Sequence, residues 1–409
     1  MKTHGKAVAL GVALLTFAAT ATTTTTTTAA AAVPPAADIA LEWFDHTRDA
    51  LAATPNQGPL AAERTWAISW LAGARAARAS GVARHQREAA LAAAVHQSLV
   101  TLVPGRTAEL DRAFSATLSK LPRDAARGIA VAEGRRQARE VVAARTGDGL
   151  DPGSLARPVS LPAPAPGVWR PTPNGYLPAV LGGLPSATPF ALDRADRFRP
   201  APPPAPDSAR YRADLTEVRY QGAAGYSTRS SAQTAVATFW VGANYPVVVQ
   251  ALRAAFAAKH PSPTRRAALV AVFFMAAIDT SIATFDAKYA YALWRPVTAL
   301  REQGVTGWSP LHETPAHPDY PAAHASYAGS AEQVLTAFTG PLTPGVITIS
   351  SPTAPSADRA YTAWWQLSSE NVDARVWSGV HTRLAGEAGA TLGRHVAAHV
   401  AAKYSWLLR

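Results

Sequence analysis

Five residues in the last third of the chain have side chains suited to binding an oxyanion. They are three cations and two imidazoles: Lys288, Arg295, Arg375, His324 and His381. They lie in the motifs KYAYALWRP, PAAH and RVWSGVH. Ammonium and guanidinium groups donate charge-assisted hydrogen bonds to anion oxygens, and an imidazole can transfer a proton or act as a nucleophile. These residue types therefore indicate a site for a tetrahedral or trigonal oxyanion.

The KYAYALWRP motif is predicted to lie on a helix over residues 286–301. Lys288 and Arg295 are seven residues apart, which is two helical turns, so both would project from one face. Pro296 directly after Arg295 indicates a kink or an end of the helix there. Cations on one helix face are usually solvated, so this motif alone does not establish a site.

The HPDYPAAH segment places His317 and His324 around two prolines, and His324 stands near the start of an apolar helix predicted over residues 322–338. A helix N-terminus offers free backbone N–H groups, which bind anions. His324 could act there as an acid or base toward a group on the anion. The alternative is a histidine that caps the helix or packs in the core.

The RVWSGVH motif sets Arg375 six residues before His381, with Gly379 between them where the backbone turns or comes close to another group. His381 could be a nucleophile or the ligand of a metal oxide, with Arg375 on the oxygens of the same anion. Each motif alone has an ordinary structural explanation. Together the three motifs favour one shared site.

Helical periodicity dominates the sequence around these motifs. Helices are predicted over residues 38–53, 60–80, 84–103, 107–121 and 123–146, and again over 208–220, 230–241, 246–259, 263–284, 286–301, 322–338, 357–375 and 382–406. No strand-like alternation of useful length is found. The sequence therefore predicts an all-α fold of two packed helical bundles with a Pro-rich irregular connecting segment.

Four regions follow from these patterns. They are a signal peptide with a Thr/Ala tract over 1–32, an N-terminal helical region over 33–146, a Pro/Gly-rich segment over 147–207 and a C-terminal helical bundle over 208–409. The Pro/Gly-rich segment contains several large aromatic residues, so it is expected to wrap in an ordered way around the protein. The alternative is a disordered linker between domains.

The charge pattern argues against nucleic acid as a partner. The formal net charge is +11 and the isoelectric point is near 10.1, but the basic residues are scattered and no run of five or more like charges occurs. Nucleic-acid surfaces instead show clustered basic residues with interleaved aromatic ones. The chain has no cysteine, which excludes disulfides and thiolate chemistry.

The first residues have the pattern of a secretory signal peptide. A basic start, an apolar stretch over residues 7–20 and small residues after it fit this class, so we expect a secreted, extracellular protein. The alternative is a retained N-terminal anchor. No stable membrane span is predicted. The apolar segment over 267–283 is interrupted by Asp279, so we interpret it as a buried helix.

The three motifs, in this order, resemble the signature of one superfamily. It joins type-2 phosphatidate phosphatases, bacterial acid phosphatases and vanadium-dependent haloperoxidases, with the pattern Lys-x6-Arg-Pro, Pro-Ser-Gly-His and Ser-Arg-x5-His-x3-Asp. Other stretches, such as SATPFALDRADRFRPAPPPAP and GVHTRLAGEAGATLGRHVAAHV, resemble its secreted bacterial haloperoxidase-like branch. The resemblance extends over nearly all of the chain after the signal peptide.

The resemblance implies a role for each residue of the site. Lys288, Arg295 and Arg375 would bind the equatorial oxygens of vanadate or phosphate. His381 would coordinate vanadium or, in a phosphatase, attack phosphorus. His324 would be the acid/base beside the apical oxygen.

Three further residues would lie near the substrate or halide, namely Phe285, Trp294 and His317. A histidine seven residues before the acid/base is a feature of the bromoperoxidase branch, so His317 favours bromide or iodide over chloride.

Three positions depart from the family pattern. Ala322 replaces a serine that would donate a hydrogen bond to the oxyanion, and Ala323 replaces a glycine whose N–H faces it. Ala385 stands where an acid usually follows the histidine. A lost donor of this kind costs about 3 kcal/mol of transition-state stabilisation, so a slower enzyme is expected.

The resemblance implies a vanadate-dependent haloperoxidase-like enzyme. Vanadate would act as a Lewis acid toward hydrogen peroxide, a halide would be oxidised to hypohalous acid, and a small organic acceptor would react with it. One alternative is an acid phosphatase that hydrolyses a phosphate ester through a phosphohistidine without vanadate. Another is a catalytically degenerate anion-binding protein. A homodimer is possible in each case.

Overall fold

The computed structural model describes residues 38–55, 58–173, 175–242, 244–258 and 262–408. The predicted signal peptide over 1–32 lies outside these residues. The described part of the chain is helical apart from one hairpin and the irregular connections, which confirms the all-α prediction.

The N-terminal half forms a bundle of five helices. They are α1 (Ile39–Ala52), α2 (Pro59–Ala79), α3 (Arg84–Leu102), α4 (Thr107–Ser119) and α5 (Ala125–Ala144), with a short 3₁₀ turn η1 (Pro104–Arg106) before α4. Asp38 and Asp124 cap α1 and α5 by accepting hydrogen bonds from the free N–H groups of the first turn. Trp66 and Trp70 of α2 are fully buried in the core of this bundle.

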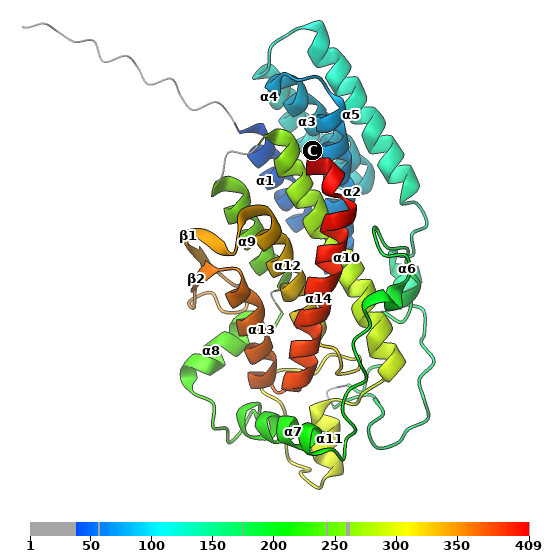
Figure 1. Cartoon of the computed structure of the whole chain (residues 1–409), viewed down its shortest axis with the longest axis vertical. Coiled ribbons are helices and arrows are strands. Elements are labelled where there is room, and N and C mark those ends of the chain that lie inside the picture. The colour runs from blue at the N-terminus through cyan, green and yellow to red at the C-terminus, as the bar shows by residue number, and fades with distance from the viewer. Residues whose placement is uncertain (1–37, 56–57, 174, 243, 259–261, 409) are drawn as a thin grey trace, which may run out of the picture. The chain divides into compact units, whose positions relative to one another are not determined.

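The C-terminal half contains the remaining long helices. They are α7 (Ala209–Gln221), α8 (Ser231–Trp240), α9 (Asn244–Ala258), α10 (Pro263–Tyr291), α11 (Pro296–Glu302), α12 (Ala323–Thr339), α13 (Trp365–Trp377) and α14 (Arg383–Lys403), followed by η4 (Ser405–Leu408). In Figure 1, α12 and α14 lie beside α10, and α13 packs on α12 and α14.

The long helix α10 belongs to both bundles. It packs on α2 of the N-terminal bundle and on α12 and α14 of the C-terminal bundle, and Phe274 of α10 stacks on Trp66 with ring centroids 4.9 Å apart. By length and composition α10 could cross a membrane, but 94% of its most apolar window is buried inside the protein. It is the shared core helix on which the two bundles meet.

The Pro/Gly-rich segment between the bundles is attached to α10 by backbone hydrogen bonds. It contains only the short turns α6 (Pro152–Leu155), η2 (Leu184–Ser186) and η3 (Ala195–Phe198). The buried carboxylate of Asp279 accepts from the backbone N–H groups of Phe190, Ala191 and Leu192 at 2.6, 2.7 and 3.0 Å. A segment without regular structure thus finds acceptors for its buried N–H groups.

A two-stranded antiparallel sheet lies beside α9 and α13, where no strand was expected (Figure 1). Strand β1 (Leu342–Ile349) pairs with β2 (Arg359–Ala363). The expected helix over 357–375 is therefore wrong in its first turns, and α13 begins at Trp365. Ile347 and Ile349 turn inward at alternate positions, and a single short hairpin gives too weak an alternation to detect in the sequence.

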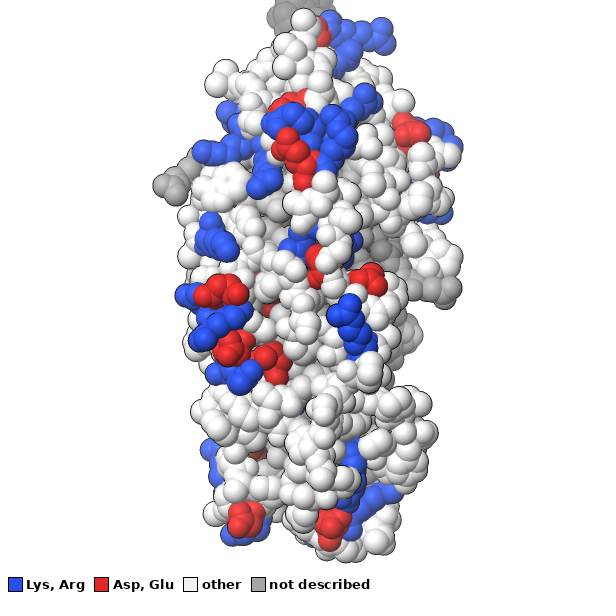
Figure 2. All heavy atoms as spheres, turned by 90° about the vertical axis from the view of Figure 1, so that its right-hand side faces the viewer, with Lys and Arg blue, Asp and Glu red and all other residues white. Residues whose placement is uncertain are grey.

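Charged residues of both signs mix on the face shown in Figure 2. Basic and acidic side chains lie next to one another there, with uncharged surface between the groups. The excess of basic residues does not form a continuous basic patch on this face.

Candidate oxyanion site

Lys288 lies on α10 and Arg295 lies just before α11, so the predicted single helix over 286–301 is wrong. Helix α10 continues to Tyr291, and Ala292 ends it in the left-handed conformation with φ 46°. Arg295 is extended, with φ −83° and ψ 155°, and precedes the first residue of α11.

The chain leaves the helix here because an isolated β-bridge holds it. The N–H of Trp169 donates to the carbonyl of Ala292 at 2.7 Å, and that of Trp294 donates to Gly167 at 2.9 Å. Pro296 also disfavours helical geometry at Arg295. The two cations therefore converge through tertiary contacts and not through helical periodicity.

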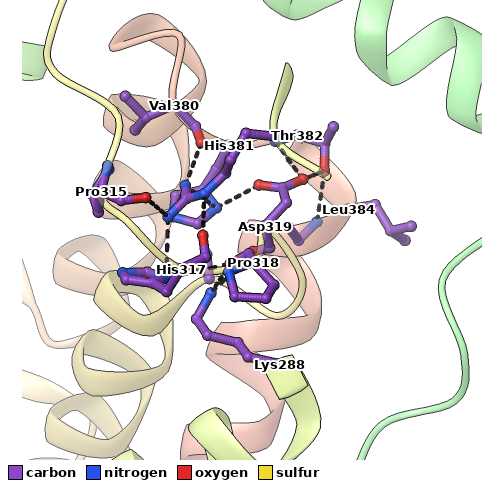
Figure 3. A network of polar contacts seen from close by, with 12 residues as sticks. Lys288, Pro315, His317, Pro318, Asp319, Val380, His381, Thr382 and Leu384 are labelled. Carbon is purple, nitrogen blue, oxygen red and sulfur yellow. Dashed lines mark hydrogen bonds and ion pairs between the residues drawn. The ribbon is translucent and has the colours of Figure 1, made fainter. Parts of the chain in front are cut away.

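Both cations hold the loop that carries His317. Lys288 Nζ donates to the carbonyls of Pro318 and Asp319 at 2.6 and 3.2 Å, and Arg295 Nε donates to the carbonyl of His317 at 2.6 Å. Figure 3 shows Lys288 beside Pro318 of this loop. Lys288 and Arg295 are both fully buried, so the loop is fixed by charge-assisted hydrogen bonds in a low-dielectric environment.

The guanidinium of Arg295 lies between two imidazoles. Nη1 donates to the carbonyl of Val380 at 2.6 Å and lies 3.1 Å from His381 Nε2. Nη2 lies 3.1 Å from His317 Nδ1 and 3.2 Å from the carbonyl of Pro315. Each nitrogen of Arg295 thus has a protein acceptor, so an oxyanion bound to Arg295 would take the place of one of them.

Asp319 is the residue of this site that the sequence analysis missed. Its Oδ1 lies 2.6 Å from His381 Nδ1, and its Oδ2 accepts from Thr382 Oγ1 at 2.8 Å (Figure 3). Burial lowers the pKa of His381 well below 6.5, and the charges of Arg295 and Lys288 lower it further. The imidazole is therefore neutral at pH 7, and the contact assigns its proton to Nδ1 and the lone pair to Nε2.

Asp319 is the acid that contacts His381, whereas Ala385, where the family pattern has an acid, carries no ionisable group. Ala385 is buried, and its carbonyl accepts from the N–H of Ala322 at 2.8 Å. Burial raises the pKa of Asp319 to about 6, against the lowering effect of Arg295. One sequence feature could have identified Asp319 as a site residue: it is the one acidic residue in the HPDYPAAH segment.

The N-terminus of α12 carries His324 and three backbone N–H groups without acceptors among the described residues, those of Ala323, His324 and Ala325. Ala322 is the N-cap, and its side chain cannot bind these groups. Burial and the charge of Arg375 lower the pKa of His324 well below 6.5. A neutral imidazole beside free N–H groups is suited to proton transfer at a bound anion.

Arg375 is the cation with free donors. It lies in the last turn of α13 and is 1% exposed, its Nε has no hydrogen-bond partner, and its Nη1 makes one long contact of 3.4 Å with the carbonyl of Val241. Burial, together with the charge of Arg295, lowers the pKa of Arg375 to about 9.

These observations fit an oxyanion. Lys288, Arg295 and Arg375 are buried, and among the described residues Asp319 is the one carboxylate whose charge acts on any of them. Buried charge without compensation is costly. A bound anion would supply the missing negative charge. No cluster of three or more His, Asp or Glu that could hold a metal ion is found in the described part of the chain.

A cavity of about 860 Å³ opens beside the site. His317, Ala323, His324 and Phe285 contribute to its lining. His317 packs on Phe285 with ring centroids 5.2 Å apart. Trp294 does not line the cavity: it is buried, and its Nε1 donates to Tyr211 Oη at 2.7 Å.

Comparison with known proteins is consistent with this geometry. Residues 268–409 match the family described as the VCPO second helical-bundle domain. This range includes all the charged and imidazole residues of the site described above. A comparison with curated protein sequences gives no significant match.

Solved structures of bacterial vanadium enzymes share the fold. A bacterial vanadium-dependent iodoperoxidase has a TM-score of 0.73 and 21% identity, covering 88% of this chain and 96% of that one. A holo-type bacterial vanadium-dependent chloroperoxidase has a TM-score of 0.68 and 15% identity, covering 90% and 97%. The apo-type chloroperoxidase has a TM-score of 0.68 and 16% identity, covering 88% and 97%.

Proposed function

We propose that this chain belongs to the vanadium haloperoxidase superfamily and is a vanadate-dependent haloperoxidase that oxidises a halide with hydrogen peroxide. The observation that carries the proposal is the buried cationic site in which neutral His381 is oriented by Asp319. Such a site favours an anion whose central atom can also be coordinated by an imidazole nitrogen.

Vanadate, when bound, supplies Lewis-acid activation of hydrogen peroxide. His381 would hold it through the Nε2 lone pair, and Arg375, Lys288 and the free N–H groups of Ala323 and His324 would bind its oxygens. His324 would take up and return a proton beside the anion. The negative charge of the anion would raise the pKa of His324 from its lowered value, toward the range in which it can exchange protons.

For the halide we propose bromide or iodide rather than chloride. His317 lies in the cavity wall next to Phe285 and contacts Arg295. A fold relative with a TM-score of 0.73 is an iodoperoxidase. We also propose that the protein is secreted, on the basis of the signal-peptide pattern over residues 1–32.

The test is a halide panel with vanadate-reconstituted protein. Bromination of monochlorodimedone in the presence of hydrogen peroxide should be measurable, should be slower with chloride, and should disappear in His381→Ala. His395→Ala is the matched control, because His395 lies on exposed α14 surface near Phe198. Absence of activity with chloride, bromide and iodide would overturn the proposal.

A second candidate is an acid phosphatase. The contact from Asp319 to His381 Nδ1 leaves Nε2 as a nucleophile, as an orienting group does for a catalytic base. Metal-free protein would then hydrolyse p-nitrophenyl phosphate, and vanadate would inhibit it. If neither reaction occurs and calorimetry detects no binding of vanadate or phosphate, the chain is a degenerate member of the fold.

A further inference from the structure

His312 is a half-buried histidine that no step of the proposed reaction uses. It lies in the connection between α11 and α12. Its Nδ1 lies 3.0 Å from Ser378 Oγ, and its backbone N–H donates to the carbonyl of Ser378 at 3.2 Å. His312 therefore holds one residue through both its side chain and its backbone.

Ser378 lies in the turn that joins two residues of the oxyanion site. It is the C-cap of α13, whose last turn carries Arg375, and it precedes His381 by three residues. Ser378 is fully buried, and within the described part of the chain its hydroxyl makes its one hydrogen bond with His312. The position of Ser378 therefore affects how Arg375 and His381 are placed relative to one another.

The turn over residues 378–380 is held by side chains at both ends. Arg295 Nη1 donates to the carbonyl of Val380 at 2.6 Å, and His312 contacts Ser378. Arg295 is one of the three cations of the oxyanion site. His312 thus does at the start of the turn what Arg295 does at its end.

The middle of the turn is packed tightly against the segment that carries His312. Gly379 has a φ of 76°, and a Cβ there would lie 2.3 Å from the carbonyl oxygen of Gly222 and 2.9 Å from Pro310 Cα. The N–H of Leu311 donates to the same carbonyl of Gly222 at 2.9 Å. Because both segments pack on Gly222, His312 approaches Ser378 in a defined orientation.

The imidazole of His312 is neutral at pH 7. Burial, together with the charges of Arg375 and Arg229, lowers the pKa of His312 to about 4. Arg229 also donates to the carbonyl of Trp377, the neighbour of Ser378, at 3.0 Å. A neutral imidazole can form a hydrogen bond with a hydroxyl in either tautomer, so the contact with Ser378 does not depend on which nitrogen carries the proton.

We propose that His312 is a positioning residue that holds Ser378 through Nδ1, fixes the turn between Arg375 and His381, and thereby increases the affinity of the site for an oxyanion. Without this contact the buried hydroxyl of Ser378 would lose its partner, and the turn would shift to satisfy it. The identity of the oxyanion as vanadate rests on the proposed function.

The test uses two amide side chains that each replace one nitrogen of the ring. The amide of asparagine reaches the position of Nδ1, whereas that of glutamine reaches the position of Nε2. In calorimetric titrations of the full chain with vanadate at pH 7, His312→Asn should keep a dissociation constant within about threefold of the wild-type value, because it keeps the contact. His312→Gln and His312→Leu should bind vanadate about tenfold more weakly, as loss of such a supporting partner typically does.

Ser378→Ala removes the other partner of the same contact and should also weaken vanadate binding about tenfold. Combined with His312→Leu it should cause no further loss, because both changes remove one interaction. A purely structural role would lower the free energy of unfolding of these variants and leave the affinity of the folded protein unchanged. The matched control is His85→Leu, which removes a half-buried histidine of α3 that pairs with Asp124 at 3.2 Å and should keep the wild-type affinity.

The proposal would be overturned by wild-type affinity in both His312→Leu and Ser378→Ala, or by a loss in His312→Asn as large as that in His312→Leu. Losses that multiply in the double variant, or a wild-type protein that binds no vanadate, would also overturn it. Ser378→Ala provides the decisive comparison if His312→Leu does not fold. Because this assay measures no halide oxidation, a wild-type protein that binds vanadate but oxidises no halide would contradict the proposed function alone.

Discussion

Asp319 determines which nitrogen of His381 is available to a ligand. Its carboxylate contacts Nδ1 at 2.6 Å and is itself held by Thr382. Partners of this kind fix the tautomer and orientation of an imidazole and raise its basicity as a ligand. The function of His381 in the proposed site therefore depends on a residue 62 positions earlier in the chain.

We expect Asp319→Asn to weaken vanadate binding about 10- to 100-fold, as loss of such a partner typically does. The amide keeps the size of the side chain but loses its charge. Calorimetric titration of each protein with vanadate measures the change in the dissociation constant. Asp286→Asn is the control, because Asp286 pairs with Arg199 near the end of the same helix as Lys288. Unchanged affinity in Asp319→Asn would contradict the assignment.

At the residue scale the sequence alone predicted the charged and imidazole groups but not how they are held. Lys288 and Arg375 are buried, and their positive charges lower the pKa of His381. Asp319 was not predicted, because its contact with His381 joins two distant segments. Trp294 was predicted near the substrate, but its side chain points to Tyr211.

Replacing Ala322 by serine would add two interactions that the alanine cannot make. One is a side-chain N-cap for α12, and the other is a hydroxyl donor to the anion. A serine there could accept from a free N–H of α12 and still donate its own proton to an anion. We expect Ala322→Ser to increase the free energy of unfolding by about 1 kcal/mol and the turnover number by about 100-fold. Chemical denaturation and the bromination assay measure the two effects.

Ala83→Ser separates these two effects. Ala83 is the N-cap of α3, likewise without a side-chain hydrogen bond, and it lies on an element outside the oxyanion site. The substitution should stabilise the protein by a similar amount and leave the turnover number unchanged. A rise in activity equal to that of Ala322→Ser would show that stability alone explains the gain.

At the element scale, α12 and α14 are held at close approach by glycines. A Cβ at Gly393 of α14 would lie 1.9 Å from the carbonyl oxygen of Ser326, and a Cβ at Gly329 of α12 would lie 2.2 Å from that of Ala390. Because α12 carries His324 and α14 directly follows His381, the distance between these helices sets the geometry of the site.

We expect Gly393→Ala to reduce the free energy of unfolding by about 1–3 kcal/mol, the usual cost of overpacking, and to reduce halide oxidation by moving the helices apart. Thermal unfolding and the bromination assay measure both losses. Gly128→Ala on α5 is the control, since a Cβ there meets nothing within 4 Å. The control should be stabilised by up to about 1 kcal/mol. Full activity in Gly393→Ala would show that the site tolerates a wider helix spacing.

The long helices were predictable because hydrophobic periodicity and helix termination by Pro and Gly are both properties of the local sequence. The prediction over 84–103 corresponds to α3 at Arg84–Leu102, and that over 382–406 to α14 at Arg383–Lys403. The end of α10 was not predictable, since the β-bridge at Leu293 comes from a segment about 125 residues away. The hairpin at β1 and β2 was missed for the same reason, because its pairing is a tertiary contact.

At the scale of the whole molecule, buried titratable groups make stability depend on pH. Glu63 has a folded-state pKa of about 8 against an ordinary value of 4.5. Between these values the folded protein holds a proton that the unfolded chain has lost, so this group makes unfolding easier as the pH rises.

Glu63→Gln isolates this effect. The free energy of unfolding of the wild-type protein, relative to the variant, should fall by up to about 5 kcal/mol between pH 4.5 and pH 8. Denaturant titrations at a series of pH values measure the difference. A difference that does not change with pH would mean that Glu63 is ionised in the folded protein.

The buried cations of the oxyanion site should cost the free protein stability that a bound anion restores. Without an anion, Arg375→Met should be more stable than the wild type by about 1–3 kcal/mol, because the variant removes an unsatisfied buried donor. With vanadate at 100 times its dissociation constant, the free energy of unfolding of the wild type should rise by about 2.7 kcal/mol, and that of the variant should rise much less.

The control is Arg253→Met, which breaks a surface ion pair with Asp45 and should keep the full response to vanadate. A variant that is less stable without the anion and gains as much from vanadate would show that Arg375 belongs to the core and not to the anion site.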